Sequence, residues 1–337
     1  MRLQQVSRTL KGQHTTLCKM NVLNPFIFAK KEPNTFIGGV GGNSVNSPSD
    51  IVSRTSLLST QIKNFKITGN NVSFYTAVNY SINNSAFKGD TYLTSYNDAD
   101  NHVVLINSEA FRGCVNFIEG YFNGCTTLID GTNTATTGVF RGCSGLEVLE
   151  LASAIQTNST NSGFYTFSGL TAITYLDLTP TYSYLSRFVF AQTNLNNVNL
   201  SHITSLGTGV RARTFQGAFG TANLPSVVNA GEQSFYSFQG TQVILPNLTA
   251  IANKNSYFAM MTSSIALIEA KKLKSLNDPA NHLDMFLNLK TGVLIKVHED
   301  LATNNSGSAD ASLVYAKASR GATVEFYDAD GNYVSTL

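Results

Sequence analysis

Charged residues are scarce in this chain. Of its 337 residues, 23 are Lys or Arg and 21 are Asp or Glu, so 13% are charged, about half of the ~25% that is usual in soluble domains. The formal net charge is only +2. This balance excludes a strongly basic nucleic-acid-binding protein, and we expect no nucleic acid among the partners.

Long hydrophobic runs are also missing. No stretch approaches the ~18 consecutive apolar residues of a transmembrane helix, so we expect no membrane insertion. Residues 1–19 are polar, and the apolar stretch at 20–29 is interrupted by two Asn and one Pro. Because a secretory signal needs ~7–15 uninterrupted apolar residues, the sequence predicts no signal peptide.

Cysteine is rare. The chain has Cys18, Cys114, Cys125 and Cys143, and none belongs to a C-x-x-C pair. A chain of this length forms an ordinary core without disulfides, so we expect free thiols. The last three each follow Phe-x-Gly, with gaps of 11 and 18 residues. This spacing indicates stacked, buried small side chains rather than the close ligand pairs of a metal site.

Catalytic patterns are absent as well. The 5 His residues have no neighbouring Ser and acid and no His-x-x-x-His partner, so nothing marks a triad or a metal-binding helix. We therefore predict a protein that is not an enzyme, with no catalytic residues, no metal and no cofactor.

Short polar residues take the place of charged ones. Asn, Ser and Thr number 34, 33 and 35, about 30% of the chain. Hydrophobic residues make up 42%, including 21 Phe and 14 Tyr, and this aromatic content excludes an ordinary disordered chain. A polar but uncharged surface is typical of all-β, extracellular or virion proteins.

From about residue 80, a phrase recurs in which Phe is followed by a variable residue and then Gly. Copies lie at 86–89, 110–114, 121–125, 139–143 and 166–169, with looser copies at 190–193, 214–217 and 237–241. The series Phe87, Phe111, Phe140, Phe167, Phe190, Phe215, Phe238, Phe258 and Phe286 advances in steps of 20 to 29 residues. Such steps are the period of leucine-rich repeats.

A second phrase, L-x-x-L-x-L, follows several copies of the first. It occurs as Leu146-x-x-Leu149-x-Leu151, Ile173-x-x-Leu176-x-Leu178 and Leu195-x-x-Val198-x-Leu200. In a strand, successive side chains point to opposite faces. The last two apolar positions should therefore face the core, and the polar residues between them, Glu150, Asp177 and Asn199, should face outward.

One such unit cannot bury its own hydrophobic face, whereas stacked units form a continuous core. The sequence therefore predicts a mainly β fold, a leucine-rich-repeat solenoid of short parallel strands and turns with an N-terminal arm and a C-terminal capping hairpin. We expect a basic arm and linker at 1–50, a short β capping region at 51–80, the solenoid at 81–300 and a C-terminal β cap at 301–337. Within the caps, we expect strand pairs at 65–68 with 72–75 and at 322–327 with 333–336.

The two phrases together resemble the BspA-like, or Treponema-type, leucine-rich repeats. The matches are close at 110–114, 140–146 and 238–251, and the resemblance covers roughly 80–300. It implies a solenoid that serves in adhesion and in protein or surface binding, with no shared catalytic residues.

The first 49 residues are basic. They contain a single acid, Glu32, and have a local net charge of +5 from Arg2, Arg8, Lys11, Lys19, Lys30 and Lys31. This excess favours an arm that docks onto a partner, the alternative being a solvated terminus.

An extracellular style of surface without an export signal favours a phage virion protein, such as a tail fibre, a tail tip or another receptor-facing component. The expected partners are other virion proteins, through the arm, and a host surface protein or glycan; a homo-oligomer is a further option. The alternatives are a bacterial cell-surface adhesin of the BspA-like class and a polysaccharide-cleaving tailspike, which needs two carboxylates facing each other across a groove. The candidate binding surface consists of outward residues of the strand phrases, Glu147, Glu150, Thr174, Asp177, Asn196 and Asn199.

Overall fold

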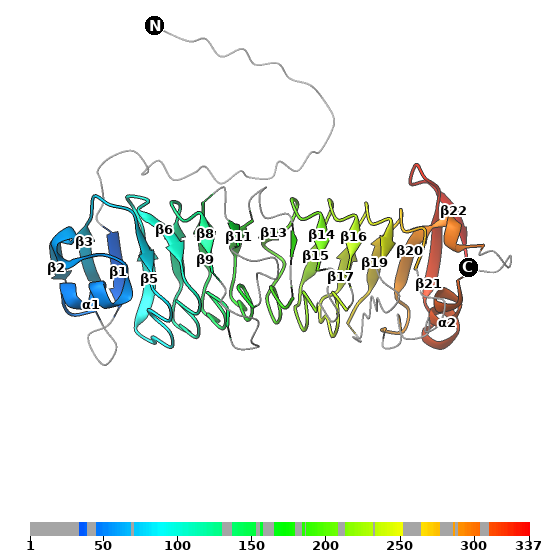
Figure 1. Ribbon diagram of the computed structural model, residues 1–337. Helices are drawn as coiled ribbons and strands as arrows, with labels where there is room; N and C mark the ends of the chain where they lie inside the picture. The colour runs from blue at the N-terminus through cyan, green and yellow to red at the C-terminus, as the bar shows by residue number, and fades with distance from the viewer. Residues whose placement is uncertain are drawn as a thin grey trace, which may run out of the picture. The chain divides into compact units, whose positions relative to one another are not determined.

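The computed structural model describes residues 34–38, 45–68, 71–129, 137–152, 156–157, 165–178, 184–185, 187–207, 213–231, 233–251, 264–276, 286, 289–303 and 310–337. In this part of the chain, successive turns of a solenoid, here called coils, stack in sequence order (Figure 1). Short strands run parallel from coil to coil. The predicted mainly β repeat fold is therefore confirmed.

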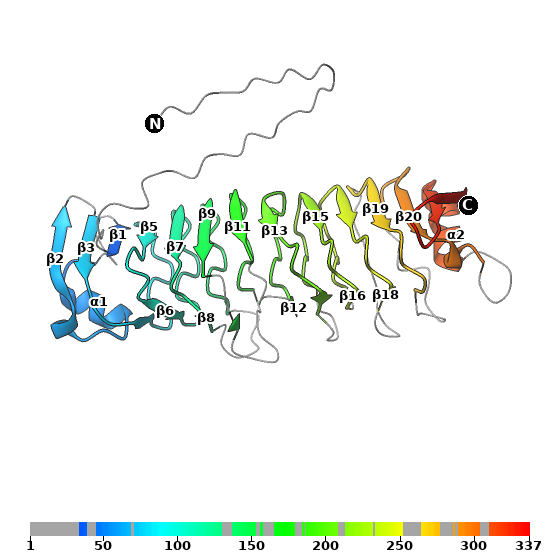
Figure 2. The ribbon, with the colours of Figure 1, turned by 90° about the horizontal axis from the view of Figure 1, so that it is seen from above.

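One strand from each coil joins a first row of parallel strands, which lie side by side in Figure 2. Along β9, Leu149 and Leu151 are buried and Glu150 between them faces outward, as the L-x-x-L-x-L phrase predicts. The row consists of β5 (Leu93–Asn97), β7 (Glu119–Phe122), β9 (Val148–Leu151), β11 (Tyr175–Asp177), β13 (Val198–Asn199), β15 (Thr221–Asn223), β17 (Gln242–Ile244), β19 (Leu267–Ala270), β20 (Leu294–His298) and β21 (Thr323–Tyr327).

The opposite side of the coils forms a second row. It consists of β4 (Tyr80–Ile82), β6 (Val103–Ile106), β8 (Thr127–Leu128), β10 (Gln156–Thr157), β12 (Tyr184–Leu185), β14 (Ser205–Leu206), β16 (Asn229–Ala230) and β18 (Ala250–Ile251). Within the described residues, the first row is interrupted between β13 and β15, and the second between β10 and β12. Where the first row is interrupted, the second row stays paired through β14 and β16. Where the second row is interrupted, the first row stays paired through β9 and β11.

Antiparallel strands cover the N-terminal end of the solenoid. The hairpin of β2 (Lys63–Thr68) and β3 (Asn71–Tyr75) confirms the expected strand pair. Strand β1 (Asn34–Gly38) pairs with β3 on one side and with β5 on the other. It thereby joins the cap to the first row.

A short helix, α1 (Pro48–Arg54), and a 3-10 turn, η2 (Ser59–Gln61), belong to the same end. The helix begins after Ser47, whose side chain accepts a hydrogen bond from the Asp50 backbone N–H. Both β1 and the first turn of α1 fall within residues 1–50, where the sequence predicts an arm and a linker. In the structure, these residues are ordered elements beside the first coil.

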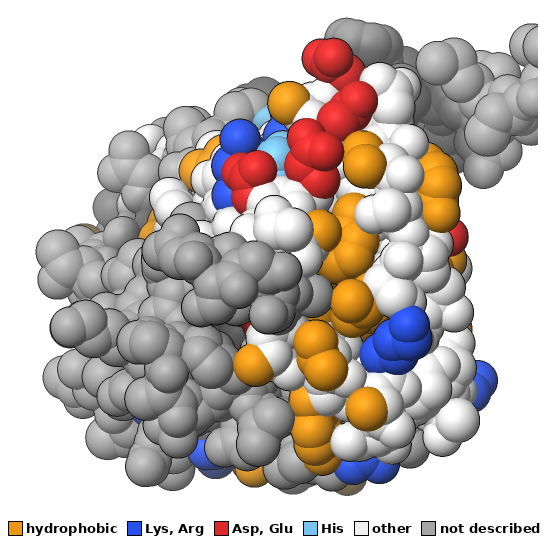
Figure 3. All heavy atoms as spheres, turned by 90° about the vertical axis from the view of Figure 1, so that its right-hand side faces the viewer, with side chains coloured by type: hydrophobic (Ala, Val, Ile, Leu, Met, Phe, Trp, Pro, Cys, Tyr) orange, Lys and Arg blue, Asp and Glu red, His pale blue; other side chains and the backbone are white. Residues whose placement is uncertain are grey.

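A helix and a hairpin cover the C-terminal end. Strand β21 pairs in parallel with β20 and antiparallel with β22 (Tyr333–Thr336), which confirms the expected terminal hairpin. Helix α2 (Ala311–Arg320) was not predicted; the Asp310 side chain caps its first turn, and Gly321, at φ +60°, ends it. Seen from this end, hydrophobic side chains form a band across the cap (Figure 3). None of the described helices is both long and apolar enough to cross a membrane.

A column of buried Phe rings runs through the core from coil to coil. The rings stack nearly parallel, as expected for a repeat whose members occupy equivalent positions. Their centroids are 5.2 Å apart for Phe87 and Phe111, 5.4 Å for Phe111 and Phe140, 6.2 Å for Phe140 and Phe167, 5.4 Å for Phe167 and Phe190, 6.1 Å for Phe190 and Phe215, and 5.1 Å for Phe215 and Phe235.

Two of the predicted repeat copies are wrong. The column continues through Phe235, and Phe238 meets that ring edge-on. Phe122 lies at the end of β7 beside Leu151 of β9, so residues 121–125 are a strand end and turn rather than a copy of the phrase. Phe258 lies outside the described residues.

Backbone conformation shows why Phe235 belongs to the column. The residue two positions after each column Phe has a positive φ, and Gly fills this position in most coils, since it adopts the conformation without steric cost. Gln192 and Ser237 occupy it with φ values of +57° and +53°. Because Ser237 follows Phe235 by two residues, the repeat geometry is complete there without a glycine.

Small side chains form a hydrogen-bonded ladder beside the column. Cys114, Cys143 and Thr193 each lie three residues after a column Phe and are buried. Each donates a hydrogen bond to the carbonyl oxygen of the column Phe one coil earlier, at 2.8 Å to Phe87, 2.9 Å to Phe111 and 2.5 Å to Phe167. The expected stack of buried small side chains is thus confirmed for these two cysteines.

Cys125 is free and buried as predicted, but it does not share the position of Cys114 and Cys143. It follows β7, and burial raises the pKa of its thiol to about 12. Such a thiol is held protonated at neutral pH and acts as a small apolar side chain. Cys18 lies outside the described residues.

Candidate binding face and the pocket between β13 and β15

Three of the six candidate residues lie in the strands of the first row, on its outward side. Strand pairing sets Leu176 beside Leu149 and Asp177 beside Asn199, so Glu150, Asp177 and Asn199 follow one another across β9, β11 and β13. The Asn199 Nδ2 donates to the Asp177 Oδ1 at 2.7 Å. The structure thus brings these three residues into one line.

The other three candidates lie where the strands begin. Glu147 and Thr174 are exposed before β9 and β11, and the Thr174 Oγ1 donates to the Glu147 carbonyl oxygen at 2.9 Å. Asn196 precedes β13, and its Oδ1 accepts a hydrogen bond from the Thr221 backbone N–H at 3.0 Å. Asn196 therefore bridges the interruption between β13 and β15.

Two tyrosines that the sequence analysis did not single out interleave with these residues. Tyr121 of β7 lies beside Glu150, and Tyr175 of β11, which is 47% exposed, lies beside Val148. The alternation that marks Asp177 as outward also marks Tyr175, two positions earlier in the same strand. We call the resulting set the acidic–aromatic strip, which consists of Glu119, Tyr121, Glu150, Tyr175, Asp177 and Asn199.

The strip is acidic throughout. Burial raises the pKa of the Tyr121 hydroxyl, and the carboxylates of Glu119 and Glu150 raise it further. Burial also raises the pKa of Tyr175, and the negative charge of Asp177 raises it further. No Lys or Arg occurs in the five strands β5, β7, β9, β11 and β13. The negative potential of this face is therefore not balanced within its own strands.

The C-terminal part of the same row is different. Glu269 of β19 lies 4.0 Å from the Lys296 ammonium of β20 and 3.9 Å from that of Lys271. The carboxylate of Glu269 is therefore balanced by two ammonium groups, although surface ion pairs of this kind contribute little to stability. The unbalanced acidic character is confined to the N-terminal half of the row.

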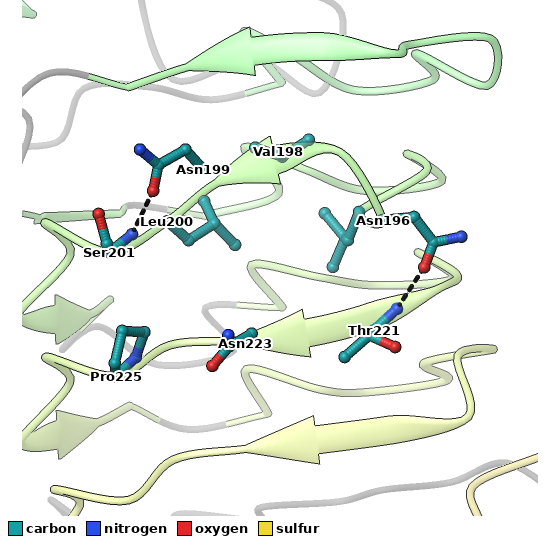
Figure 4. A pocket seen from close by; sticks show the side chains of 9 residues that line it. Asn196, Val198, Asn199, Leu200, Ser201, Thr221, Asn223 and Pro225 are labelled. Atoms are coloured by element: carbon teal, nitrogen blue, oxygen red, sulfur yellow. Dashed lines mark hydrogen bonds between the residues drawn. The ribbon is translucent and has the colours of Figure 1, made fainter. Parts of the chain in front are cut away.

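A pocket of about 260 Å³ opens where the first row is interrupted (Figure 4). It lies between β13 and β15 and contains no charged side chain. Its walls consist of Leu195, Asn196, Val198, Asn199, Leu200, Ser201, Thr221, Asn223 and Pro225. Of these, the sequence analysis named Asn196 and Asn199 as outward residues only, because a gap between two strands leaves no signal in the sequence.

Carboxyl chemistry was an alternative that the sequence left open. Burial raises the pKa of Asp98 to about 6. The hydrogen bonds that its carboxylate accepts from the backbone N–H groups of Val103 and His102 lower this pKa in part. The side chain is only 2% exposed, so Asp98 shapes the turn between β5 and β6.

Metal ligation has no candidate in the described part of the chain, where no group of three or more His, Cys, Asp or Glu is placed to hold an ion.

The predicted docking residues Arg2, Arg8, Lys11, Lys19, Lys30 and Lys31 lie outside the described residues.

Comparison with known proteins agrees with the coil geometry. Residues 80–218 match the model of a BspA type leucine rich repeat region in six copies, and no curated protein and no solved structure matches the chain. Strand pairing continues the coils beyond residue 218, through β15, β17 and β19. The repeat region suggests a role in protein binding or adhesion, and this repeat family is non-enzymatic. The match supports the assignment of the repeat segment of this chain to the BspA-type leucine-rich repeats.

Proposed function

We propose that this protein is a non-enzymatic binding component of a phage particle, a tail fibre, tail tip or other receptor-facing virion protein. The acidic–aromatic strip contacts a host surface protein or glycan. The observation that carries the proposal is the exposed Tyr175 of β11, which lies beside Val148 and next to the neighbouring acidic pair of Glu150 on β9 and Asp177 on β11. The surface composition and the basic arm of the sequence support the particle context.

The strip suits binding for three physical reasons. Tyrosine offers a large amphipathic contact area at low cost in side-chain entropy. Carboxylate and amide groups accept and donate hydrogen bonds to hydroxyls or cationic groups of a partner. Parallel strands hold these groups at a fixed spacing of ~4.8 Å, so little ordering is needed on association.

A triple substitution tests the strip. Glu150→Gln, Asp177→Asn and Tyr175→Ser together remove two charges and the aromatic ring while keeping outward polar side chains. We expect binding of the fluorescently labelled protein to a panel of intact bacterial cells to fall at least tenfold, which is ~1.4 kcal/mol. The matched control, Asp330→Asn, changes an exposed carboxylate in the C-terminal hairpin turn and should bind as the wild type does. Equal binding by the triple variant would contradict the proposal.

The particle context has its own test. Deletion of residues 1–31 removes the basic segment and leaves β1 and α1 in place. We expect the full chain to be detected by mass spectrometry in purified phage particles, and the truncated chain to fold but to be missing from them. Normal incorporation of the truncated chain would show that the arm does not dock.

A bacterial cell-surface adhesin is the second candidate, and the BspA-type repeat match favours it. The same mass-spectrometric measurement separates the two. An adhesin would be recovered from the cell envelope of the producing bacterium and would be missing from its phage particles.

A further inference from the structure

The pocket between β13 and β15 results from a local change in how two coils meet. Elsewhere in the first row, neighbouring strands pair as a parallel ladder, whereas β13 and β15 do not. The Asn196 Oδ1 accepts a hydrogen bond from the Thr221 backbone N–H at 3.0 Å. A hydrogen bond to a side chain thus stands where the ladder would have one to a backbone carbonyl. Gly220, at φ +90°, is required beside it, since a Cβ there would lie 2.6 Å from the same Oδ1.

The polar groups of the pocket are arranged at its two ends (Figure 4). Asn196 and Thr221 lie at one end, and Asn199, Ser201 and Asn223 at the other. Asn199 is held at both amide atoms, because its Nδ2 donates to Asp177 and its Oδ1 accepts from the Ser201 N–H at 3.0 Å. The lining is therefore oriented before any ligand arrives.

Leu195, Val198 and Leu200 of the β13 coil close the pocket from the core side and are only 2%, 9% and 2% exposed. Pro225, which follows β15, lies at the same end as Ser201 and Asn223 (Figure 4). The volume of about 260 Å³ holds about nine water molecules at ~30 Å³ each and lies just below the ~300 Å³ at which pockets for drug-sized ligands begin. The part of a ligand that enters the pocket is therefore about the size of one six-membered ring with its substituents.

The chemistry of the lining residues limits the class of ligand that the pocket can bind. Amide and hydroxyl groups donate and accept hydrogen bonds without carrying charge. None of the nine lining residues is a Lys or Arg that could bind an anionic group, and the Asp177 carboxylate beside Asn199 repels one. Uncharged hydrogen-bonding groups at both ends of a small pocket match a neutral ring that carries hydroxyls around its rim.

We propose that this pocket is a subsite for one neutral sugar residue, a hexose or an N-acetylhexosamine. Thr221, Asn223 and Ser201 bind the hydroxyls of the ring, and apolar contact with its C–H face is limited to the accessible edges of Val198 and Pro225. The inference goes beyond the proposed function, because the pocket binds its sugar whether or not the acidic–aromatic strip contacts a macromolecule.

The test uses the full chain with glucose, galactose and N-acetylglucosamine as probes, followed by saturation-transfer NMR and titration. We expect at least one of the three to bind, and galacturonate, which carries a carboxylate, to bind at least tenfold more weakly. Thr221→Val and Asn223→Ala are made separately, so that a folding defect in one leaves the other to decide. Each should weaken the sugar at least tenfold.

Asn197→Ala is the matched control, since this exposed Asn adjoins β13 outside the pocket lining, and its sugar affinity should be that of the wild type. A variant with Glu150→Gln and Tyr175→Ser, which leaves the hydrogen bond between Asp177 and the pocket residue Asn199 intact, should weaken cell binding through the strip and still bind the monosaccharide within threefold. Absence of binding by all three neutral sugars would overturn the inference, and so would unchanged affinity in folded Thr221→Val and Asn223→Ala proteins.

Discussion

Replacement of Phe140 by Ala is expected to destabilise the solenoid by about 3–5 kcal/mol. Phe140 is fully buried and stacks between Phe111 at 5.4 Å and Phe167 at 6.2 Å. Its removal leaves a cavity in the middle of the column and takes a ring partner from both neighbours, and each such pair contributes ~0.5–1.5 kcal/mol beyond its buried area. Chemical denaturation followed by circular dichroism measures the change.

Two further substitutions separate this effect from a general sensitivity to mutation. Phe140→Leu keeps much of the buried volume and should cost clearly less than Phe140→Ala. Val115→Ala changes a side chain that is 43% exposed and should stay within about 0.5 kcal/mol of the wild type. A loss below about 1 kcal/mol for Phe140→Ala would show that the column is not the spine of the fold.

Gly231→Ala is expected to be at least as damaging, for a different reason. A Cβ at this position would lie 1.3 Å from the backbone oxygen of Gly207 and 3.1 Å from that of Leu206. Backbone of a neighbouring coil cannot rotate away as a side chain can, so the coils of β14 and β16 must separate. We expect a loss above about 3 kcal/mol, the upper end of ordinary overpacking, or failure to accumulate as soluble protein.

Gly89→Ala is the control for this prediction. A Cβ on Gly89 meets no heavy atom within 4 Å, and the cost comes only from its φ of +70°, about 1–2 kcal/mol. The thermal midpoints of the two variants measure the difference. Equal midpoints would mean that close approach of the coils at Gly231 does not limit stability.

The repeat itself could be predicted because its signals are local. Leu146, Leu149 and Leu151 carry the period-two alternation of a strand, and Phe140-x-Gly carries the turn before it. The error at Phe238 arose because the same stretch contains two Phe residues and only Phe238 is followed by Gly at the expected distance. The column instead uses Phe235, since Ser237 adopts the required positive φ.

The caps were predicted less completely. Helix α2 has an N-cap signal in Asp310 and a C-cap signal in Gly321, but its apolar face is short, with Leu313 and Ala316 buried. Strand β1 has no useful local signal, because its partners β3 and β5 follow it far along the chain. Contacts of that kind depend on the tertiary fold more than on propensity.

The candidate site shows the same division. The outward positions of Glu150, Asp177 and Asn199 follow from strand alternation alone, and strand pairing places the three side by side on β9, β11 and β13. Tyr175 carries the same alternation signal, although the predicted binding surface contains no aromatic residue. The pocket depends on a missing ladder between two coils, which only the three-dimensional pairing reveals.

The two interruptions of the strand rows fall at different junctions between coils, so that no junction lacks strand pairing in both rows. Where the first row parts between β13 and β15, the second is continuous through β14 and β16; where the second parts between β10 and β12, the first is continuous through β9 and β11. In a stacked repeat, stability is transmitted from each unit to its neighbour. At both junctions one row therefore still couples the two coils, and the gap that forms the pocket does not divide the solenoid into two independently stable pieces.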